Sequence, residues 1–254
     1  MRWSLWIAVA VIWCHPAVLV ESAYADEAED LKGQVRQLVE AAIEAGDLPG
    51  AVVGLWQNGQ WRLRETYGQR SVDPPETMTF DTVFDMASIT KPVATATSAM
   101  LLVQDGRLDL NSRVCDILPE FKEQWRDEVR VWHLMTHTAG LIPDNALADY
   151  QSGPEAAWGK LMGSAIKSPP GSKFVYSDVG FLLLGKVVEQ VSGKGLNEFA
   201  RERIFAPLGM RDSGYLPGEE LVRRTAPTEP RDGKMLRGEV HDPRAALLGG
   251  VAGH

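Results

Sequence analysis

The stretch "FDMASITKP", residues 84–92, decides how the rest of the chain is interpreted. It places Ser88 and Lys91 three residues apart, with a proline directly after the lysine. Pro92 has no N–H and fits only the first turn of a helix, so the sequence predicts a helix that begins near Ser88 or Ile89. Because residues three apart on a helix share a face, we expect the Lys91 amine to lie against the Ser88 hydroxyl.

Two interpretations of Ser88 are open at this point. A serine at a helix start can simply cap the helix. It can also be a nucleophile, since the helix N-terminus favours negative charge and an adjacent amine can accept the hydroxyl proton. The spacing alone does not decide, because the chain has a second Ser-x-x-Lys at Ser164 and Lys167. That copy runs directly into a Pro-Pro-Gly break and has no comparable helix start.

The segment Tyr176-Ser177-Asp178 favours the nucleophile. It is expected in a loop, just before a helix that starts near Val179. A tyrosine hydroxyl beside Lys91 can share its proton and pass it to a leaving group. In isolation, a tyrosine such as Tyr176 is more often a half-buried aromatic residue, and an aspartate such as Asp178 is more often a helix N-cap.

Together these segments resemble the serine β-lactamase and penicillin-binding-protein superfamily, in its class C-like branch of β-lactamases, D-Ala-D-Ala carboxypeptidases and related esterases. The resemblance covers about residues 27–254 and rests on "FDMASITKP", "VWHLMTHTAGL", "PPGSKFVYSDVGFLLLGKVVEQVSG", "IFAPLGM" and "GEVHDPRAALLGGVAGH", in this order. It implies that Ser88 is the acylated nucleophile, Lys91 its activating partner, and Tyr176 the general base and acid.

The chain departs from the family pattern at two places. Asp178 stands where β-lactamases carry asparagine, and an ionised carboxylate cannot donate a hydrogen bond to a substrate carbonyl. As a substrate-binding residue, Asp178 therefore favours esters or peptides over β-lactams. The family's third motif, a strand with Lys or His that ends in glycine, is not found before His254. We expect a C-terminally truncated chain with an incomplete oxyanion hole, inactive by itself.

The periodicity predicts an α/β (α+β) fold, with an antiparallel sheet flanked by helices and a mostly helical subdomain. The C-terminal sheet strands and helix are expected to be missing from this chain. Helices are expected over 30–45, 93–105, 179–192 and 197–208, and two strands joined by a turn at Asn58-Gly59 over 51–68. Residues 107–175 are expected to be helical and loop-like. The helix over 93–105 is apolar on nearly every face and is expected to be buried all round, and strands are expected only in the first part of the chain.

The N-terminus has the pattern of a signal peptide, residues 1–25, which leaves residues 26–254 as one hydrolase domain. Arg2 precedes an apolar run, and Ala23-Tyr24-Ala25 is a small-x-small cleavage signal. The apolar run is too short and too interrupted for a retained membrane anchor. We therefore expect a periplasmic or secreted protein with no transmembrane anchor after cleavage.

The sequence disfavours several other chemistries. A net charge of −8 disfavours a nucleic-acid partner. His133 and His137 share a helical spacing, but Leu134 stands where metalloproteases carry glutamate. We therefore predict packing and hydrogen-bonding histidines near the wall of the site, and no metal or cofactor. His241-Asp242 suggests a Ser-His-Asp triad, but no Gly-x-Ser-x-Gly elbow accompanies it. Cys115 is predicted to be buried filler.

The sequence thus predicts an exported serine hydrolase that acts through a Ser-Lys-Tyr acyl-enzyme mechanism. Its expected substrates are small-molecule esters, lactams or peptidoglycan-type D-amino-acid peptides, and it is expected to be a monomer. The alternative is a catalytically incomplete fragment, or a homologue that binds peptidoglycan or peptide without turnover.

Overall fold

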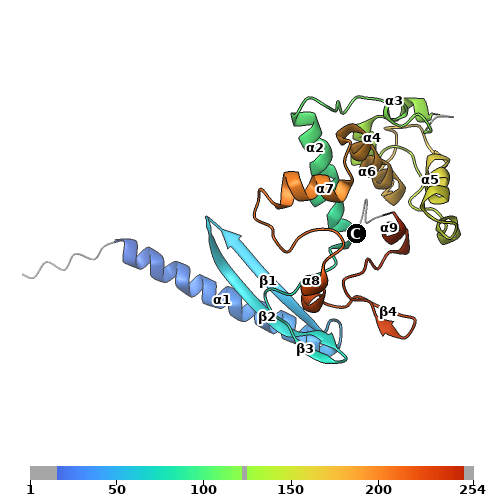
Figure 1. Cartoon of the computed structure of the whole chain (residues 1–254). Coiled ribbons are helices and arrows are strands. Elements are labelled where there is room, and N and C mark those ends of the chain that lie inside the picture. Colours follow the sequence, from blue (N-terminus) through green and yellow to red (C-terminus); the bar gives the residue numbers. More distant parts are fainter. Residues whose placement is uncertain (1–15, 122–124, 249–254) are drawn as a thin grey trace, which may run out of the picture. The chain divides into compact units, whose positions relative to one another are not determined.

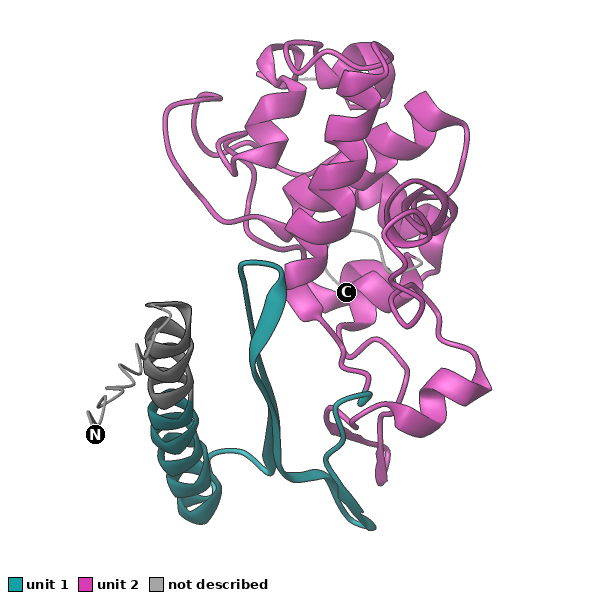
Figure 2. Cartoon of the chain, turned by 90° about the vertical axis from the view of Figure 1, so that its left-hand side faces the viewer, with its two compact units in different colours: residues 1–82 teal, residues 83–254 magenta. Residues whose placement is uncertain are grey.

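The computed structural model of the chain describes residues 16–121 and 125–248. The chain divides after Thr82 into two compact units, residues 1–82 and 83–254, which are described separately (Figure 2). The first unit holds a three-stranded antiparallel sheet, and the second is mostly helical. This confirms the predicted α/β class, with its sheet and its mostly helical subdomain.

The first unit consists of one long helix and the sheet (Figure 1). The helix α1 (Pro16–Ala45) contains the predicted helix as its C-terminal half. The strands β1 (Gly50–Gln57) and β2 (Gln60–Val72) form the predicted hairpin. Asn58 and Gly59 join them with φ angles of 52° and 79°, the left-handed conformation that a two-residue hairpin turn requires.

A third strand, β3 (Pro75–Thr77), pairs with β2 and gives the strand order β1-β2-β3. The sequence did not predict it, because three residues are too short to carry an alternating pattern. Its addition gives the hairpin the third strand that an independent sheet needs.

The predicted signal peptide lies partly outside the described residues. Residues 1–15 fall outside them, and residues 16–25 belong to α1. Over residues 16–121 and 125–248, none of the helices combines the length and the apolar character that a membrane span needs.

The second unit is built from short helices around one central helix. The central helix is α6 (Asp178–Ser192), which buries nine of its 15 residues, among them Val179, Leu183 and Val187. Gly193, with φ 73°, ends it as predicted. The other helical segments of this unit are η1 (Ala87–Ile89), η2 (Lys91–Ala96), α2 (Thr97–Gln104), α3 (Val114–Ile117), η3 (Arg126–Glu128), α4 (Val131–Met135), η4 (Leu147–Tyr150), α5 (Pro154–Met162), α7 (Leu196–Ala200), η5 (Arg201–Phe205), α8 (Glu219–Arg224) and α9 (Pro243–Leu247).

The prediction of a helix buried all round over 93–105 is wrong. Ala99 and Leu102 of α2 are fully buried, but Val93 and Met100 remain 39% and 44% exposed. Apolar composition alone did not distinguish this helix, which has one exposed side, from α6.

The prediction that strands occur only in the first part of the chain is also wrong. A small hairpin forms from β4 (Pro230–Arg231) and β5 (Lys234–Met235). Its turn residues Asp232 and Gly233 have φ angles of 51° and 77°. Asp-Gly is itself a strong hairpin signal, so the sequence contained the information.

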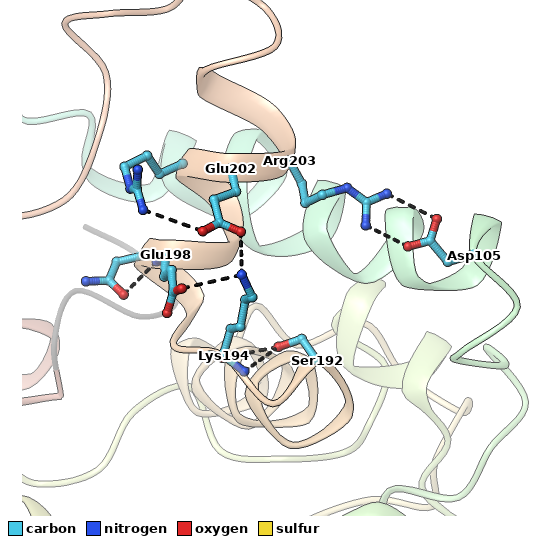
Figure 3. A network of polar contacts seen from close by, with 8 residues as sticks. Asp105, Ser192, Lys194, Glu198, Glu202 and Arg203 are labelled. Atoms are coloured by element: carbon cyan, nitrogen blue, oxygen red, sulfur yellow. Dashed lines mark hydrogen bonds and ion pairs between the residues drawn. The ribbon is translucent and has the colours of Figure 1, made fainter.

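A network of polar side chains supports the region around α7 (Figure 3). Lys194 pairs with Glu198 and Glu202. Arg203 of η5 donates two hydrogen bonds, of 2.7 and 3.1 Å, to the carboxylate of Asp105, the residue that follows α2. The two-bond geometry fixes the orientation of both groups and ties the end of α2 to η5.

Replacing Arg203 with glutamine is expected to lower the melting temperature slightly at neutral pH. The Arg203 hydrogen bonds hold the pKa of the Asp105 carboxyl below its ordinary value of 3.8. A carboxyl whose pKa falls on folding adds stability above its unfolded pKa and loses this contribution as the pH falls through its folded pKa. The difference in melting temperature should therefore be full near pH 7 and disappear in acid, once the pH falls below the lowered pKa of Asp105. It stays small because the pair is partly exposed.

Thermal melts of both proteins across this pH range provide the measurement. Arg201→Gln is the matched control, since Arg201 is more exposed and lies 3.6 Å from its partner Glu202. A difference for Arg203→Gln that persists unchanged into acid would contradict the assigned role of Asp105.

Candidate active site

Ser88 lies in a short 3-10 turn, η1, that opens the helical run of residues 87–104. The turn passes into η2, a stretch of π-helix, and then into α2. The predicted helix start near Ser88 is confirmed. Ala87, directly before Ser88, has a φ of 44°, which is uncommon for a residue other than glycine. Strained backbone and π-helical turns both occur frequently at functional sites.

Lys91 is buried against the Ser88 hydroxyl. The residue is only 2% exposed, and its Nζ donates a hydrogen bond of 2.9 Å to Ser88 Oγ. Ser88 itself is exposed. The prediction that the two side chains share a face is confirmed. The amine is kept from water while the hydroxyl remains open to a ligand.

Asp178 is the second partner of the buried lysine. Its Oδ1 lies 2.7 Å from Lys91 Nζ. Asp178 is the first residue of α6, and the cap of this helix is Ser177, whose Oγ accepts the N–H of Gly180 at 3.0 Å. The alternative in which Asp178 caps the helix is therefore wrong. Its carboxylate faces the lysine instead.

Tyr176 completes the group of predicted site residues. Its ring centroid lies 5.1 Å from Lys91 Nζ, and its side chain is 46% exposed. The four site residues that the sequence predicts therefore meet around one buried ammonium group: Ser88, Lys91, Tyr176 and Asp178. A lysine amine in this position can accept the proton of a hydroxyl. Its ammonium form can stabilise negative charge nearby and exchange protons with a phenol or a carboxylate.

His137 supports the segment that carries Tyr176. Its ring lies 4.4 Å from the Tyr176 ring, its carbonyl accepts the N–H of Val175 at 2.8 Å, and its Nδ1 accepts the N–H of Ser177 at 3.1 Å. Burial, followed by the nearby charge of Lys91, lowers the pKa of His137. A neutral ring can keep Nδ1 as an acceptor at neutral pH. This is the hydrogen-bonding role that the sequence favoured over metal binding.

His133 makes a separate structural bond. Its Nδ1 accepts the N–H of Arg130, the residue that precedes α4, at 2.9 Å, and burial lowers its pKa. In the part of the chain that the structure describes, no cluster of three histidine, cysteine, aspartate or glutamate side chains could hold a metal ion.

The second Ser-x-x-Lys pair has a different environment. Ser164 is 4% exposed, and its Oγ lies 3.3 Å from both Asn145 Oδ1 and the carbonyl of Lys160. Lys167 is exposed. The Ser164 hydroxyl therefore satisfies buried carbonyl groups, as a structural serine does.

His241, which adjoins Asp242 in the sequence, contacts a different carboxylate. Its Nδ1 lies 2.7 Å from Oδ2 of Asp85, whereas Asp242 Oδ1 accepts the N–H of Arg244 at the start of α9. Sequence reasoning did not identify Asp85, although it lies only three residues before Ser88. Cys115 lies half-buried in α3 rather than fully buried.

Known proteins share this sequence pattern and this fold. The family model Beta-lactamase matches residues 35–253. The N-acetylmuramyl-L-alanine amidase of Bacillus subtilis strain 168 is 32% identical over 257 residues, which cover 87% of this chain and 58% of that protein. A solved class C beta-lactamase has a TM-score of 0.73 at 21% identity and shows the same fold, with 88% of this chain and 62% of that chain covered.

A third similar protein is EstCE1, described as a hydrolase with promiscuous acyltransferase activity. It has a TM-score of 0.67 at 26% identity, with 83% of this chain and 60% of that chain covered. The chain thus spans less than two thirds of the length of each of these relatives. Because the family model matches from residue 35 to residue 253 and the class C fold recurs in the structure, the chain belongs to the beta-lactamase family.

Proposed function

We propose that the protein is a serine hydrolase in which Ser88 becomes acylated. The observation that supports this most is the position of Lys91, which is 2% exposed and bonded to Ser88 Oγ at 2.9 Å. A serine that only caps a helix needs no ammonium group beside it. Burying such a group is costly unless it is paired, so its presence beside Ser88 calls for a role. The family of the chain supports the same chemistry.

The proposed reaction begins with proton transfer from Ser88. Lys91 hands one proton to Asp178, whose Oδ1 is 2.7 Å away, and then accepts the proton of the Ser88 hydroxyl. The Ser88 oxygen bonds to the substrate carbonyl carbon, and the bond to the leaving group breaks. Lys91 passes the Ser88 proton through the Tyr176 hydroxyl to the leaving group, and Asp178 returns its proton to Lys91. Water then attacks the acyl-enzyme, which releases the acid and restores the Ser88 hydroxyl.

The proposed substrates are esters, D-amino-acid peptides of the peptidoglycan type, or β-lactams. The name of the Bacillus subtilis amidase supports an amide of the peptidoglycan type as substrate, and the description of EstCE1 supports acyl transfer by a hydrolase. In our proposal the Asp178 carboxylate exchanges a proton with Lys91. Its charge beside the reacting groups also influences which substrates bind. We further propose that residues 1–25 direct export, that residues 26–254 are the hydrolase domain, and that the protein acts as a monomer in the periplasm or outside the cell.

Covalent labelling tests the proposal. We expect a fluorophosphonate probe to form one bond between phosphorus and Ser88 Oγ, with loss of fluoride. Proteolysis and mass spectrometry of the whole protein, at the length its gene encodes, should locate the adduct at Ser88. Ser164 is an internal control in the same digest and should stay unmodified. An adduct at Ser164 would contradict the assignment, and no adduct would favour a homologue that binds peptide without turnover.

A further inference from the structure

The segment His241–Ala245, called here the HDPRA segment, contacts the loop before the nucleophile. His241 Nδ1 lies 2.7 Å from Oδ2 of Asp85, and the backbone N–H of His241 donates to the same oxygen at 3.3 Å. The Asp85 side chain is 12% exposed and that of His241 is 34% exposed. The hydrogen bond to the Asp85 carboxylate is thus partly shielded from water, which strengthens a charge-assisted bond.

Asp85 in turn holds the residue that precedes Ser88. Its other oxygen, Oδ1, accepts the N–H of Ala87 at 2.9 Å. Ala87 has a φ of 44°, a conformation that persists only when surrounding contacts enforce it. The carboxylate of Asp85 therefore connects His241 to the strained peptide that sets the direction of the Ser88 side chain.

The other end of the HDPRA segment contacts the loop beside Asp178. Arg244 Nε donates to the carbonyl of Asn145 at 3.2 Å, and its Nη1 lies 3.6 Å from Asp144. In the same loop, the carbonyl of Pro143 accepts the N–H of Asp178 at 2.8 Å. The segment thus contacts Asp85, which bonds to the turn of Ser88, and the loop of residues 143–145, which bonds to Asp178.

We propose that His241 is a positioning residue that acts through Asp85 on the turn of Ser88. The contacts form a closed circuit of hydrogen bonds. His241 bonds to Asp85, Asp85 accepts the N–H of Ala87, and Arg244 donates to the loop that bonds to Asp178. Lys91 closes this circuit by bonding to both Ser88 and Asp178. The distance between the nucleophile and its proton acceptor is therefore set partly by a segment that touches neither. This inference rests on the proposed role of Ser88.

The test measures the rate of Ser88 acylation in the whole protein. With the fluorophosphonate probe, His241→Ala is expected to lower the second-order rate constant about 10- to 100-fold, because small misplacements of a reacting group have large effects on rate. His241→Asn should recover most of the rate, since the Asn amide N–H₂ occupies nearly the position of the histidine Nδ1. His241→Gln should not, because its amide reaches toward the Nε2 position. Glu239→Ala, an exposed charge in the same loop, is the matched control and should leave the rate unchanged.

A double-mutant cycle tests whether His241 acts through Asp85. Asp85→Asn combined with His241→Ala should be no slower than the slower single variant. Fully multiplicative losses, or equal rates for His241→Ala and the unaltered protein, would overturn the positioning role. A lower melting temperature with equal loss in the Ala, Asn and Gln variants would also overturn it, in favour of a merely structural role. If the unaltered protein is not labelled at Ser88, the proposed function fails together with this inference.

Discussion

Replacing Ser88 with alanine is expected to reduce kcat/KM for an activated ester by about 10⁴-fold or more. Alanine has no oxygen to form the acyl bond, and neither Lys91 nor Tyr176 can take its place without a rearrangement of the site. Steady-state hydrolysis of a p-nitrophenyl ester, together with intact-mass measurement of probe labelling, gives the comparison. Labelling should disappear completely.

The folding of this variant should change little, which makes the result interpretable. The Ser88 side chain is exposed, and its hydroxyl accepts the hydrogen bond from Lys91. We expect a melting temperature close to that of the unaltered protein. Ser164→Ala is the matched control, because it removes the hydroxyl of the second Ser-x-x-Lys pair. It should keep the hydrolytic rate but lower stability, since its hydroxyl is buried between two carbonyl oxygens. Labelling that survives in Ser88→Ala would contradict the nucleophile assignment.

The parts of the fold that depend on local signals could be predicted from the sequence. The Asn58-Gly59 turn, the helix start at Ser88 and the glycine at the end of α6 each follow from the conformational preferences of one or two residues. The burial of α2 and the strand β3 could not. The burial of a helix depends on which elements pack against it, and a three-residue strand depends on its partner.

The candidate site divides along the same line. Ser88 and Lys91 are close in sequence, so helical geometry alone brings them together. Asp178 was placed on the substrate side because an amide at this position would face a ligand, yet the fold turns its carboxylate onto Lys91. Asp85 and His241 are separated by 156 residues, and no local pattern connects them. A motif therefore identified the proposed nucleophile, while the residues that we propose to orient it required the structure.

Replacing Lys91 with methionine is expected to lower the acylation rate by about 10²- to 10⁴-fold, the usual contribution of a positioned general acid or base. Methionine has a similar length and suits a buried position, but it cannot accept the Ser88 proton. The change also leaves the Asp178 carboxylate, 23% exposed, without its counter-charge. We therefore expect a lower melting temperature as well, because an unpaired and partly buried charge is destabilising.

The double variant Lys91→Met with Asp178→Asn separates these two effects. Removing the orphaned charge should restore much of the melting temperature, whereas the acylation rate should stay as low as in Lys91→Met alone. Lys167→Met, at the exposed lysine of the second Ser-x-x-Lys pair, is the matched control and should change neither quantity. If the double variant regained its rate together with its stability, Lys91 would serve to fold the site rather than to move the proton of Ser88. If it regained neither, the unpaired charge of Asp178 would not explain the lower melting temperature of Lys91→Met.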